Sequence, residues 1–308
     1  MKIIEIKDID NYSLAKSLDC LERMGKLFPI VRTNLNSCRM FVDDKRCNCL
    51  LEVTQISNTI KVAILFGQAS EIDIDWLTEK VRDVFDLDNP IYNEFYSNLN
   101  AYGDVNSREL MKSLNGLRLI KDISLMNCVF RTIISQQVSL KVASNMVRKF
   151  VTRYDHRLYF DGVYYYQFPN VEFIANNLTI SQLREIGIPA RRANAIIDVS
   201  SKILALDNSL EDYSFRELEE LLISVKGIGQ WTVEMLGLFY FMVPDTIPVA
   251  DLGLHRAVEH LYKLPTRTVS KTNVKEFTNR WCGNKSLLVY YIWEFWMLSK
   301  VDKEQNYD

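Results

Sequence analysis

Helical periodicity from about residue 106 onward constrains the fold more than any other feature of the sequence. Seven segments there repeat apolar residues at intervals of three and four, with short polar, glycine or proline breaks between them. They are LMNCVFRTIISQQ, SLKVASNMVRKFVTRY, PARRANAIIDVSSKILAL, SFRELEELLISV, WTVEMLGLFYFMV, ADLGLHRAVEHLY and SLLVYYIWEFWMLS. One interruption, LYFDGVYYYQF, carries an Asp161-Gly162 turn between aromatic runs and predicts a small β-hairpin. We therefore expect residues 106–308 to form a helical domain.

The first hundred residues show a different pattern. Residues 37–66 contain β-branched runs separated by turn-forming pairs, which predict antiparallel strands. The segment IDIDWLTEKVRDVFDL that follows has helical spacing. We expect an α+β domain with an antiparallel sheet at residues 1–105, so the whole chain is mainly α with an N-terminal α+β domain.

Composition restricts the class of protein further. With 308 residues, 48% of them hydrophobic, the chain is long enough to bury one or two cores. The absence of a signal-peptide pattern and of a long apolar run predicts an intracellular protein that does not enter a membrane.

Charge and cysteine content exclude some partners and cofactors. The net charge of −2 does not mark a strongly basic nucleic-acid binder. The six cysteines form no repeated C-x-x-C pattern, so they support neither a zinc site nor a disulfide framework. The C-terminal region contains only Cys282, which excludes a four-cysteine iron–sulfur cluster there. Residues 119–161 are locally basic, and this stretch predicts either a face for nucleic acid or an ordinary solvated helix surface; its cations are Lys121, Arg131, Lys141, Arg148, Lys149, Arg153 and Arg157.

The stretch VKGIGQWT predicts a tight turn between two helices. One helix is expected to end near Ser224 and the next to begin near Gln230, with Gly227 and Gly229 between them. Glycine permits positive φ and close backbone approach, and the first N–H groups of the new helix attract an anion. The stretch is therefore either a phosphate-binding hairpin or a tight corner anchored by Ile228.

Asp251 stands twenty positions after Trp231, in the segment IPVADLGLHRAV. Aspartate at this position suits a helix N-cap, and a carboxylate beside a phosphate-binding hairpin suits catalysis on a nucleic acid. Both interpretations remain open on the residues alone.

The hairpin LISVKGIGQWTVEML followed by Asp251 resembles the helix-hairpin-helix superfamily of DNA base-excision glycosylases. The resemblance is closest to the 3-methyladenine DNA glycosylase II group and extends over more than two thirds of the chain. Further matching fragments occur in order: FDLDNPI, NGLRLIKD, IISQQVS, QFPN, IGIPARRANAI and WCGNKSLLVYYIWEFW. It implies the helix-hairpin-helix DNA glycosylase fold, with the motif at about residues 215–241.

The resemblance implies a base-excision site. Asp251 is expected to stabilise the cationic sugar and to activate water. Trp231 and Trp293 are expected to line the base pocket, with Tyr290 nearby, although residues of this stripe also suit plain core packing. Met235 stands where the family carries a pocket tyrosine, a departure that leaves the substrate range open.

The same resemblance bears on strand cleavage and on contacts to the duplex. Members that also cut the strand carry a lysine where this chain has Trp231, so we expect no lyase activity. Within IISQQVS, on the first long helix, Gln137 occupies the wedge position, with Gln136 as the alternative. Backbone contacts are expected from Gly227, Ile228, Gly229, Gln230, Thr232 and His255, and a structural Na⁺ or K⁺ from the main-chain carbonyls of Ile223, Val225 and Ile228.

The expected function is a monofunctional DNA glycosylase of base excision repair that removes alkylated purines such as 3-methyladenine from double-stranded DNA. It requires no cofactor and acts as a monomer in the cytoplasm, on the nucleoid of a prokaryote. One alternative keeps the fold and changes the lesion to an oxidised or deaminated purine, 8-oxoguanine or hypoxanthine. The other is a non-catalytic helix-hairpin-helix DNA-binding protein, which would need neither Asp251 nor the tryptophans.

Overall fold

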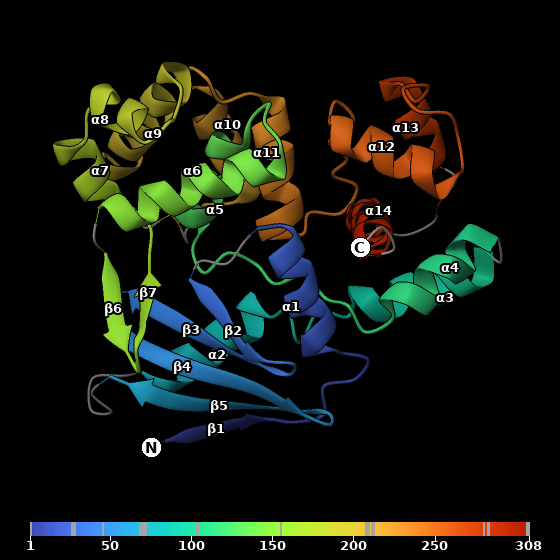
Figure 1. Ribbon diagram of the computed structural model, residues 1–308, viewed down its shortest axis with the longest axis horizontal. Coiled ribbons are helices and arrows are strands. Elements are labelled where there is room, and N and C mark those ends of the chain that lie inside the picture. The colour runs from blue at the N-terminus through green and yellow to red at the C-terminus, as the bar shows by residue number, and fades with distance from the viewer. Residues whose placement is uncertain are drawn as a thin grey trace.

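The structure is a computed structural model, in which an antiparallel sheet lies on one side of a larger helical body (Figure 1). It describes residues 2–25, 29–44, 46–67, 73–102, 105–154, 156–206, 210, 213–279, 281 and 284–305. Cys282 lies outside these residues. The mainly helical fold with a small N-terminal sheet confirms the fold class predicted from the sequence.

The sheet has five antiparallel strands in the order β1-β5-β4-β3-β2. Its centre confirms the strands predicted at residues 37–66, and Met40 on β3 pairs with Leu51 on β4. The two edge strands, β1 and β2, are short and were not predicted. In chain order the strands are β1 (Ile3–Ile6), β2 (Ile30–Asn34), β3 (Ser37–Asp44), β4 (Cys47–Ile56) and β5 (Thr59–Phe66).

Two helices share one hydrophobic core with this sheet. They are α1 (Leu14–Arg23), which the sequence did not predict, and α2 (Ile74–Val84), which confirms the helical spacing seen there. Ile120 and Ile123 also enter this core, although they lie beyond residue 105. The sheet therefore packs against the chain that leads into the helical body.

The helical body has its own, larger core. Helix α3 joins this core through buried residues such as Tyr92 and Phe95, although it lies within residues 1–105. The helices are α3 (Ile91–Tyr102), α4 (Val105–Leu114), α5 (Leu125–Ser135), α6 (Leu140–Arg153), α7 (Val171–Asn177), α8 (Ile180–Glu185), α9 (Ala190–Leu204), α10 (Phe215–Ile223), α11 (Gln230–Leu236), the π-helical turn η2 (Gly237–Phe241), α12 (Leu252–Leu261), α13 (Lys271–Asn279) and α14 (Lys285–Gln305).

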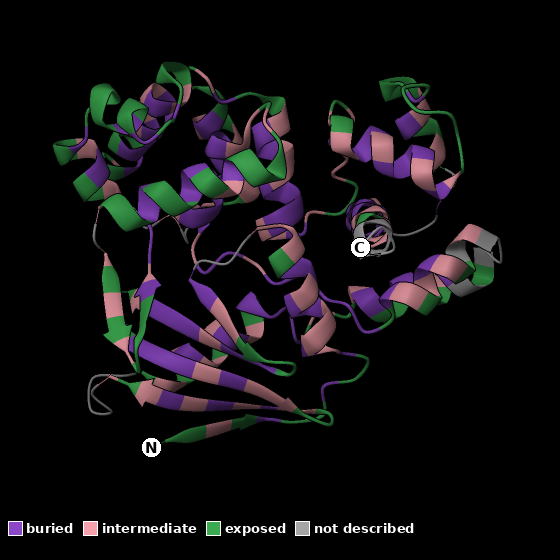
Figure 2. Cartoon of the chain, viewed as in Figure 1, coloured by how far each residue is buried: buried purple, intermediate pink, exposed green. Residues whose placement is uncertain are grey.

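Helix α14 runs through the middle of this body. Its residues from Leu287 to Trp293 are buried, and it packs against α12, α4 and η2 (Figure 2). Such burial on every side explains why its sequence is apolar around the whole helix rather than along one stripe.

The predicted β-hairpin is confirmed as β6 (Arg157–Phe160) and β7 (Val163–Tyr166). Asp161 and Gly162 both have positive φ, 51° and 79°, as a two-residue turn of this kind requires. Tyr165 packs on Phe41 and Leu50 of the large sheet. The hairpin thus joins the helical body to the sheet.

An ion pair strengthens this joint. His156, just before β6, contacts the carboxylate of Asp43 on β3. Hydrogen bonding to Asp43 raises the pKa of His156, and the same bond lowers the pKa of Asp43.

None of the described helices is long and apolar enough to cross a membrane. Among the same residues, no cluster of three or more His, Cys, Asp or Glu side chains is arranged to hold a metal ion.

Candidate active site

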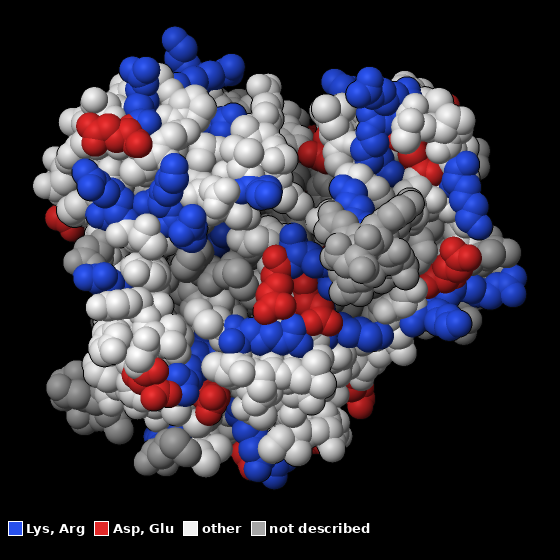
Figure 3. Space-filling view, in the orientation of Figure 1, with Lys and Arg blue, Asp and Glu red and all other residues white. Residues whose placement is uncertain are grey.

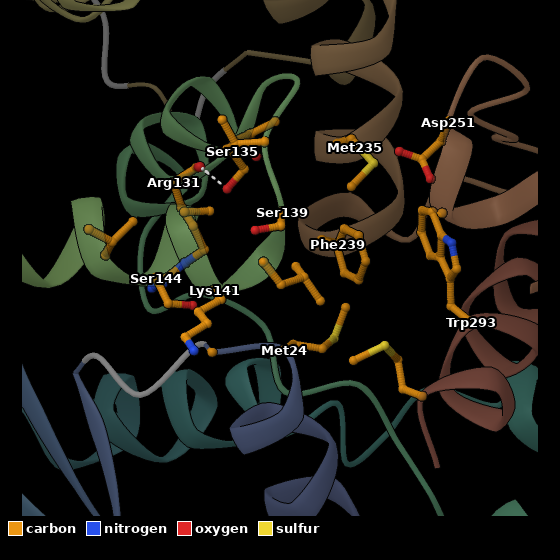
Figure 4. Close-up of a pocket in the computed structure, with 18 of the residues that line it drawn as sticks. Met24, Arg131, Ser135, Ser139, Lys141, Ser144, Met235, Phe239, Asp251 and Trp293 are labelled. Atoms are coloured by element: carbon orange, nitrogen blue, oxygen red, sulfur yellow. Dashed lines mark hydrogen bonds between the residues drawn. The ribbon is translucent and has the colours of Figure 1, made fainter. Parts of the chain in front are cut away.

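A cavity of about 530 Å³ opens between the α5–α6 pair and the helices α11, α12 and α14. Figure 4 shows two facing walls. Asp251, Trp293, Met235 and Phe239 form one, and the residues of α5 and α6 form the other. Trp231 and Tyr290 also line the cavity. The structure therefore brings together the whole set of residues that the sequence assigned to catalysis and to the base pocket.

The carboxylate of Asp251 is held by a hydrogen bond to each oxygen. Asp251 is the N-cap of α12, and its Oδ1 accepts the backbone N–H of Leu254 at 2.8 Å. Its Oδ2 accepts the indole N–H of Trp231 at 3.0 Å. The side chain is half-buried and lines the cavity. Capping and presentation to a ligand, which the sequence offered as alternatives, therefore coexist in one residue.

Aromatic rings form much of the wall beside Asp251. The rings of Trp293 and Phe239 stack with their centroids 5.8 Å apart and their planes 10° from parallel. Tyr290 meets Phe239 edge-on, and its hydroxyl lies 3.0 Å from Sγ of Cys20. Such a wall favours a flat, electron-poor or cationic ring.

Phe239 was missed by the sequence analysis. Its signal was present, because Trp231, Met235 and Phe239 recur at intervals of four and line the same cavity. The ring sits on the π-helical turn η2, where an ordinary helical projection is shifted. Turns of this kind often occur at functional sites, and here one carries a cavity residue.

The opposite wall is mixed, with polar side chains beside apolar ones such as Val138 and Val147. Arg131 is buried and paired with Asp122 at 2.9 Å, and Ser135 and Ser139 lie nearby with Lys141 (Figure 4). Because Arg131 is neutralised within the wall, it is not part of an exposed basic face.

The other cations of the locally basic stretch on and before α6 are of two kinds, one paired with an aspartate and the rest exposed at the surface. Lys121 is bound to Asp83 at 2.9 Å. Cations on α6 stay at the surface, where Figure 3 shows Lys and Arg side chains gathered over this part of the molecule. They are Lys141, Arg148, Lys149 and Arg153.

The sheet side also reaches the cavity. Met24, which follows α1, lines its floor, and the neighbouring Arg23 forms an ion pair with Glu294 of α14. Burial raises the pKa of Glu294, and the guanidinium of Arg23 opposes that rise. This contact could not be predicted from the sequence, because its partners are 271 residues apart.

The predicted helix-hairpin-helix is formed by α10, a glycine turn and α11. Gly227 has φ of +105°, and a Cβ built on it would lie 3.3 Å from Ala195. The turn is therefore restricted to glycine by its backbone and by close packing on α9.

A glutamine from the α5–α6 turn supports this hairpin. Nε2 of Gln136 donates to the carbonyl of Gly227 and to the hydroxyl of Thr232, both at 3.0 Å. Because its amide is occupied in this way, Gln136 is a tether rather than a free wedge.

Gln137 is free of such contacts among the described residues. It is exposed and has φ of +54° in the turn between α5 and α6. The expected helical position is therefore wrong, since α5 ends at Ser135 and α6 begins at Leu140. The Gln137 side chain therefore projects from the α5–α6 turn into solvent and not from a helix face.

Two expected backbone contacts need correction. Thr232 is 2% exposed, and its hydroxyl accepts the hydrogen bond from Gln136. His255 is 8% exposed, with Nε2 at 2.8 Å from the carbonyl of Val249, to which it donates. Both side chains are turned inward and hydrogen-bonded within the protein, which the residue type alone does not reveal.

The outer end of the hairpin is open. A Cβ on Gly229 would meet nothing within 4 Å, and Gln230 beside it is exposed. Within the described residues, no backbone acceptor lies on the N–H groups of Gly229, Gln230 and Trp231. These donors mark the start of a helix and can receive an anion.

A helical hairpin with outward-facing N–H groups, beside a carboxylate in an aromatic cavity, defines a protein of the helix-hairpin-helix glycosylase class. The family model described as HhH-GPD superfamily base excision DNA repair protein matches residues 130–284. The chain belongs to this superfamily.

Individual proteins extend the similarity to nearly the whole chain. A DNA-3-methyladenine glycosylase of Bacillus subtilis is 23% identical over 304 residues, which cover 94% of this chain and 97% of the relative. The structure of a 3-methyladenine DNA-glycosylase from Archaeoglobus fulgidus aligns with a TM-score of 0.78 at 25% identity, covering 96% of this chain and 98% of that one. An 8-oxoguanine glycosylase/lyase of Clostridium acetobutylicum, solved with double-stranded DNA, shares the fold with a TM-score of 0.71 at 20% identity over 98% and 99% of the two chains.

Proposed function

We propose that this protein is a monofunctional DNA glycosylase that hydrolyses the N-glycosidic bond of alkylated purines such as 3-methyladenine in double-stranded DNA. The observation that carries the proposal is the Asp251 carboxylate, which two hydrogen bonds fix at the aromatic wall of the cavity. Superfamily membership and the 3-methyladenine glycosylases similar to this chain support it.

In the proposed mechanism the damaged nucleotide leaves the helix and its base enters the cavity. An alkylated purine carries a positive charge, which the faces of Trp231, Trp293 and Phe239 attract through cation–π and stacking forces. The charge also makes the base a good leaving group, so the chemistry needs no strong general acid. This electrostatic match favours alkylated purines over neutral 8-oxoguanine.

Asp251 acts on the sugar. As the glycosidic bond breaks, positive charge develops on the sugar ring, and a fixed carboxylate stabilises it without having to reorganise. The same group accepts a proton from the attacking water. The hydrogen bonds from Trp231 and Leu254 hold the carboxylate in one orientation throughout.

The proposal of no lyase activity rests on Trp231. The indole nitrogen of Trp231 is part of an aromatic ring and is not a primary amine, so it cannot form a Schiff base with the sugar. Two lysines do line the cavity, Lys141 on α6 and Lys300 on α14. Lys141 lies on the wall opposite Asp251 (Figure 4), and Nζ of Lys300 lies 3.4 Å over the ring of Trp296. Neither takes the place of the lysine that Trp231 replaces.

For duplex binding we propose the open end of the hairpin and Gln137. The N–H groups of Gly229, Gln230 and Trp231 bind a phosphate, which fixes register without reading sequence. Gln137 enters the stack where the nucleotide has left, because its side chain is exposed in the α5–α6 turn and the next two residues, Val138 and Ser139, line the cavity.

A monovalent cation at the hairpin is part of the proposal. The carbonyls of Ile223 and Ile228 accept no backbone hydrogen bond from the described residues, and that of Val225 accepts only the N–H of Ile228, at 3.1 Å. Neutral carbonyl oxygens of this kind suit Na⁺ or K⁺, which would add positive charge beside the phosphate. The chemistry at Asp251 needs no other cofactor.

The test uses duplexes that contain 3-methyladenine, 7-methylguanine, hypoxanthine or 8-oxoguanine. We expect release of the alkylated bases, intact strands before alkali treatment, and no adduct after borohydride. Release of 8-oxoguanine or hypoxanthine alone would move the protein to the alternative lesion class. Duplex binding without release of any base would make it a non-catalytic binder, and a borohydride adduct lost in Lys141→Ala or Lys300→Ala would show lyase chemistry.

A further inference from the structure

Gly253 occupies an unexpected position in α12. It lies in the first turn of this helix, two residues after Asp251, and lines the cavity. Its φ is not in the left-handed region, so the backbone alone would accept any L-residue. Glycine is also a poor helix former. Neither local conformation nor propensity explains a glycine here.

Space around Gly253 does explain it. A Cβ on this residue would lie 2.8 Å from Oδ1 of Asp251 and 3.4 Å from the indole Nε1 of Trp293. The first distance is shorter than real Cβ contacts allow, so an added methyl group must displace the carboxylate. The second distance is tight, so the Trp293 ring closes the route on that side.

The carboxylate has little freedom to move without losing its partners. Oδ1 is the oxygen that accepts the N–H of Leu254, and Oδ2 accepts the indole N–H of Trp231. A rotation of the side chain away from Gly253 therefore breaks the first bond and bends the second. The absence of a Cβ at Gly253 therefore allows the Asp251 carboxylate to keep both of its hydrogen-bond donors.

We propose that Gly253 is a positioning residue for catalysis, which keeps Asp251 and Trp293 in adjacent places by leaving the space of a side chain empty. The inference rests on the proposed function, since it concerns how the proposed catalytic group is held. It assigns a role to a residue that contacts the substrate through no side chain of its own.

The experiment is Gly253→Ala, measured in single turnover with excess enzyme on a 3-methyladenine duplex. A shift of about 1 Å at a reacting group costs about 100-fold in rate, and we expect a loss of that order. The melting temperature is expected to change little, because the helix propensity gained with alanine offsets the loss of the N-cap hydrogen bond, two effects of similar size. The Kd for a duplex with a tetrahydrofuran abasic analogue is expected to stay within about twofold, since the hairpin is untouched.

Leu252→Ala is the matched control, because Leu252 is the preceding residue of the same turn and is 70% exposed. It is expected to keep the wild-type rate. A wild-type rate in Gly253→Ala would overturn the inference. So would a lost rate together with a lower melting temperature or weakened duplex binding, because that result would assign Gly253 to folding. If the wild-type protein released no base at all, the proposed function would fail instead.

Discussion

The hydrogen bond between Trp231 and Asp251 leads to a quantitative prediction for Trp231→Phe. The substitution keeps an aromatic ring at the cavity and removes the indole N–H that donates to Oδ2 at 3.0 Å. The N-cap bond from Leu254 to Oδ1 remains. The variant therefore tests orientation of the carboxylate separately from the existence of the carboxylate.

The size of the effect follows from the geometry. A hydrogen bond to a charged group contributes about 1.5–3 kcal/mol. Asp251 is only half-buried, so water replaces part of that bond and the lower end of the range applies. Since about 1.4 kcal/mol corresponds to a factor of ten, we expect about a tenfold slower chemical step from this bond alone.

Trp293→Phe provides the matched comparison. It makes the same change in ring size within the same cavity, but no hydrogen bond of the Trp293 indole N–H is found within the described residues. Both variants are assayed for release of 3-methyladenine in single turnover at saturating enzyme. The decrease in rate that both variants share measures the effect of the smaller ring. The additional decrease in Trp231→Phe measures the effect of the lost hydrogen bond on the orientation of the Asp251 carboxylate. Equal losses in the two variants would refute the reasoning.

Three further predictions concern the surrounding structure. Asp251→Asn is expected to slow base release by about 1,000-fold, on the estimate of about 4 kcal/mol for a charge at 4 Å in a partly exposed site, while thermal denaturation shows little loss because asparagine also caps helices. Gln136→Ala removes two hydrogen bonds from the hairpin and is expected to lower the unfolding free energy by about 1–3 kcal/mol in urea titration and to weaken duplex binding; unchanged values would contradict the tether. The raised pKa of His156 means that its ion pair with Asp43 stabilises the fold below the ordinary histidine value of 6.5, and that this contribution is lost as pH rises through the raised pKa. The melting temperature of wild type minus that of His156→Gln is therefore expected to shrink as the pH rises above 6.5, and a constant difference would contradict it.

The sequence predicted elements whose signal is local. The hairpin turn at Asp161-Gly162 and the strands of residues 37–66 follow from turn chemistry and β-branched runs, and the structure confirms them. The turn around Gly227 is also local, since positive φ there demands glycine. Helix α3 was overlooked although its signal is local, because its buried residues Tyr92, Phe95, Tyr96 and Leu99 recur at helical spacing along one stripe.

The site was only partly visible in the sequence. The spacing and the family resemblance directed attention to Asp251 and Trp231, which the structure places in direct contact. Which way a polar residue points depends on tertiary packing, and the residue types of Thr232 and His255 did not reveal that both side chains are buried. Phe239 continues the spacing of four from Trp231 and Met235 and was overlooked, whereas Gly253 depends on an empty volume, for which no residue pattern is diagnostic.

The buried ion pair between Arg23 and Glu294 limits how the N-terminal part of this chain can be changed. Glu294 is 2% exposed, and its countercharge comes from the opposite end of the polypeptide. Without Arg23 this carboxylate would lose its ion-pair partner, and an unpaired buried carboxylate costs about 3–5 kcal/mol. A variant that loses Arg23 must therefore also replace Glu294 to keep the cavity wall that this residue lines.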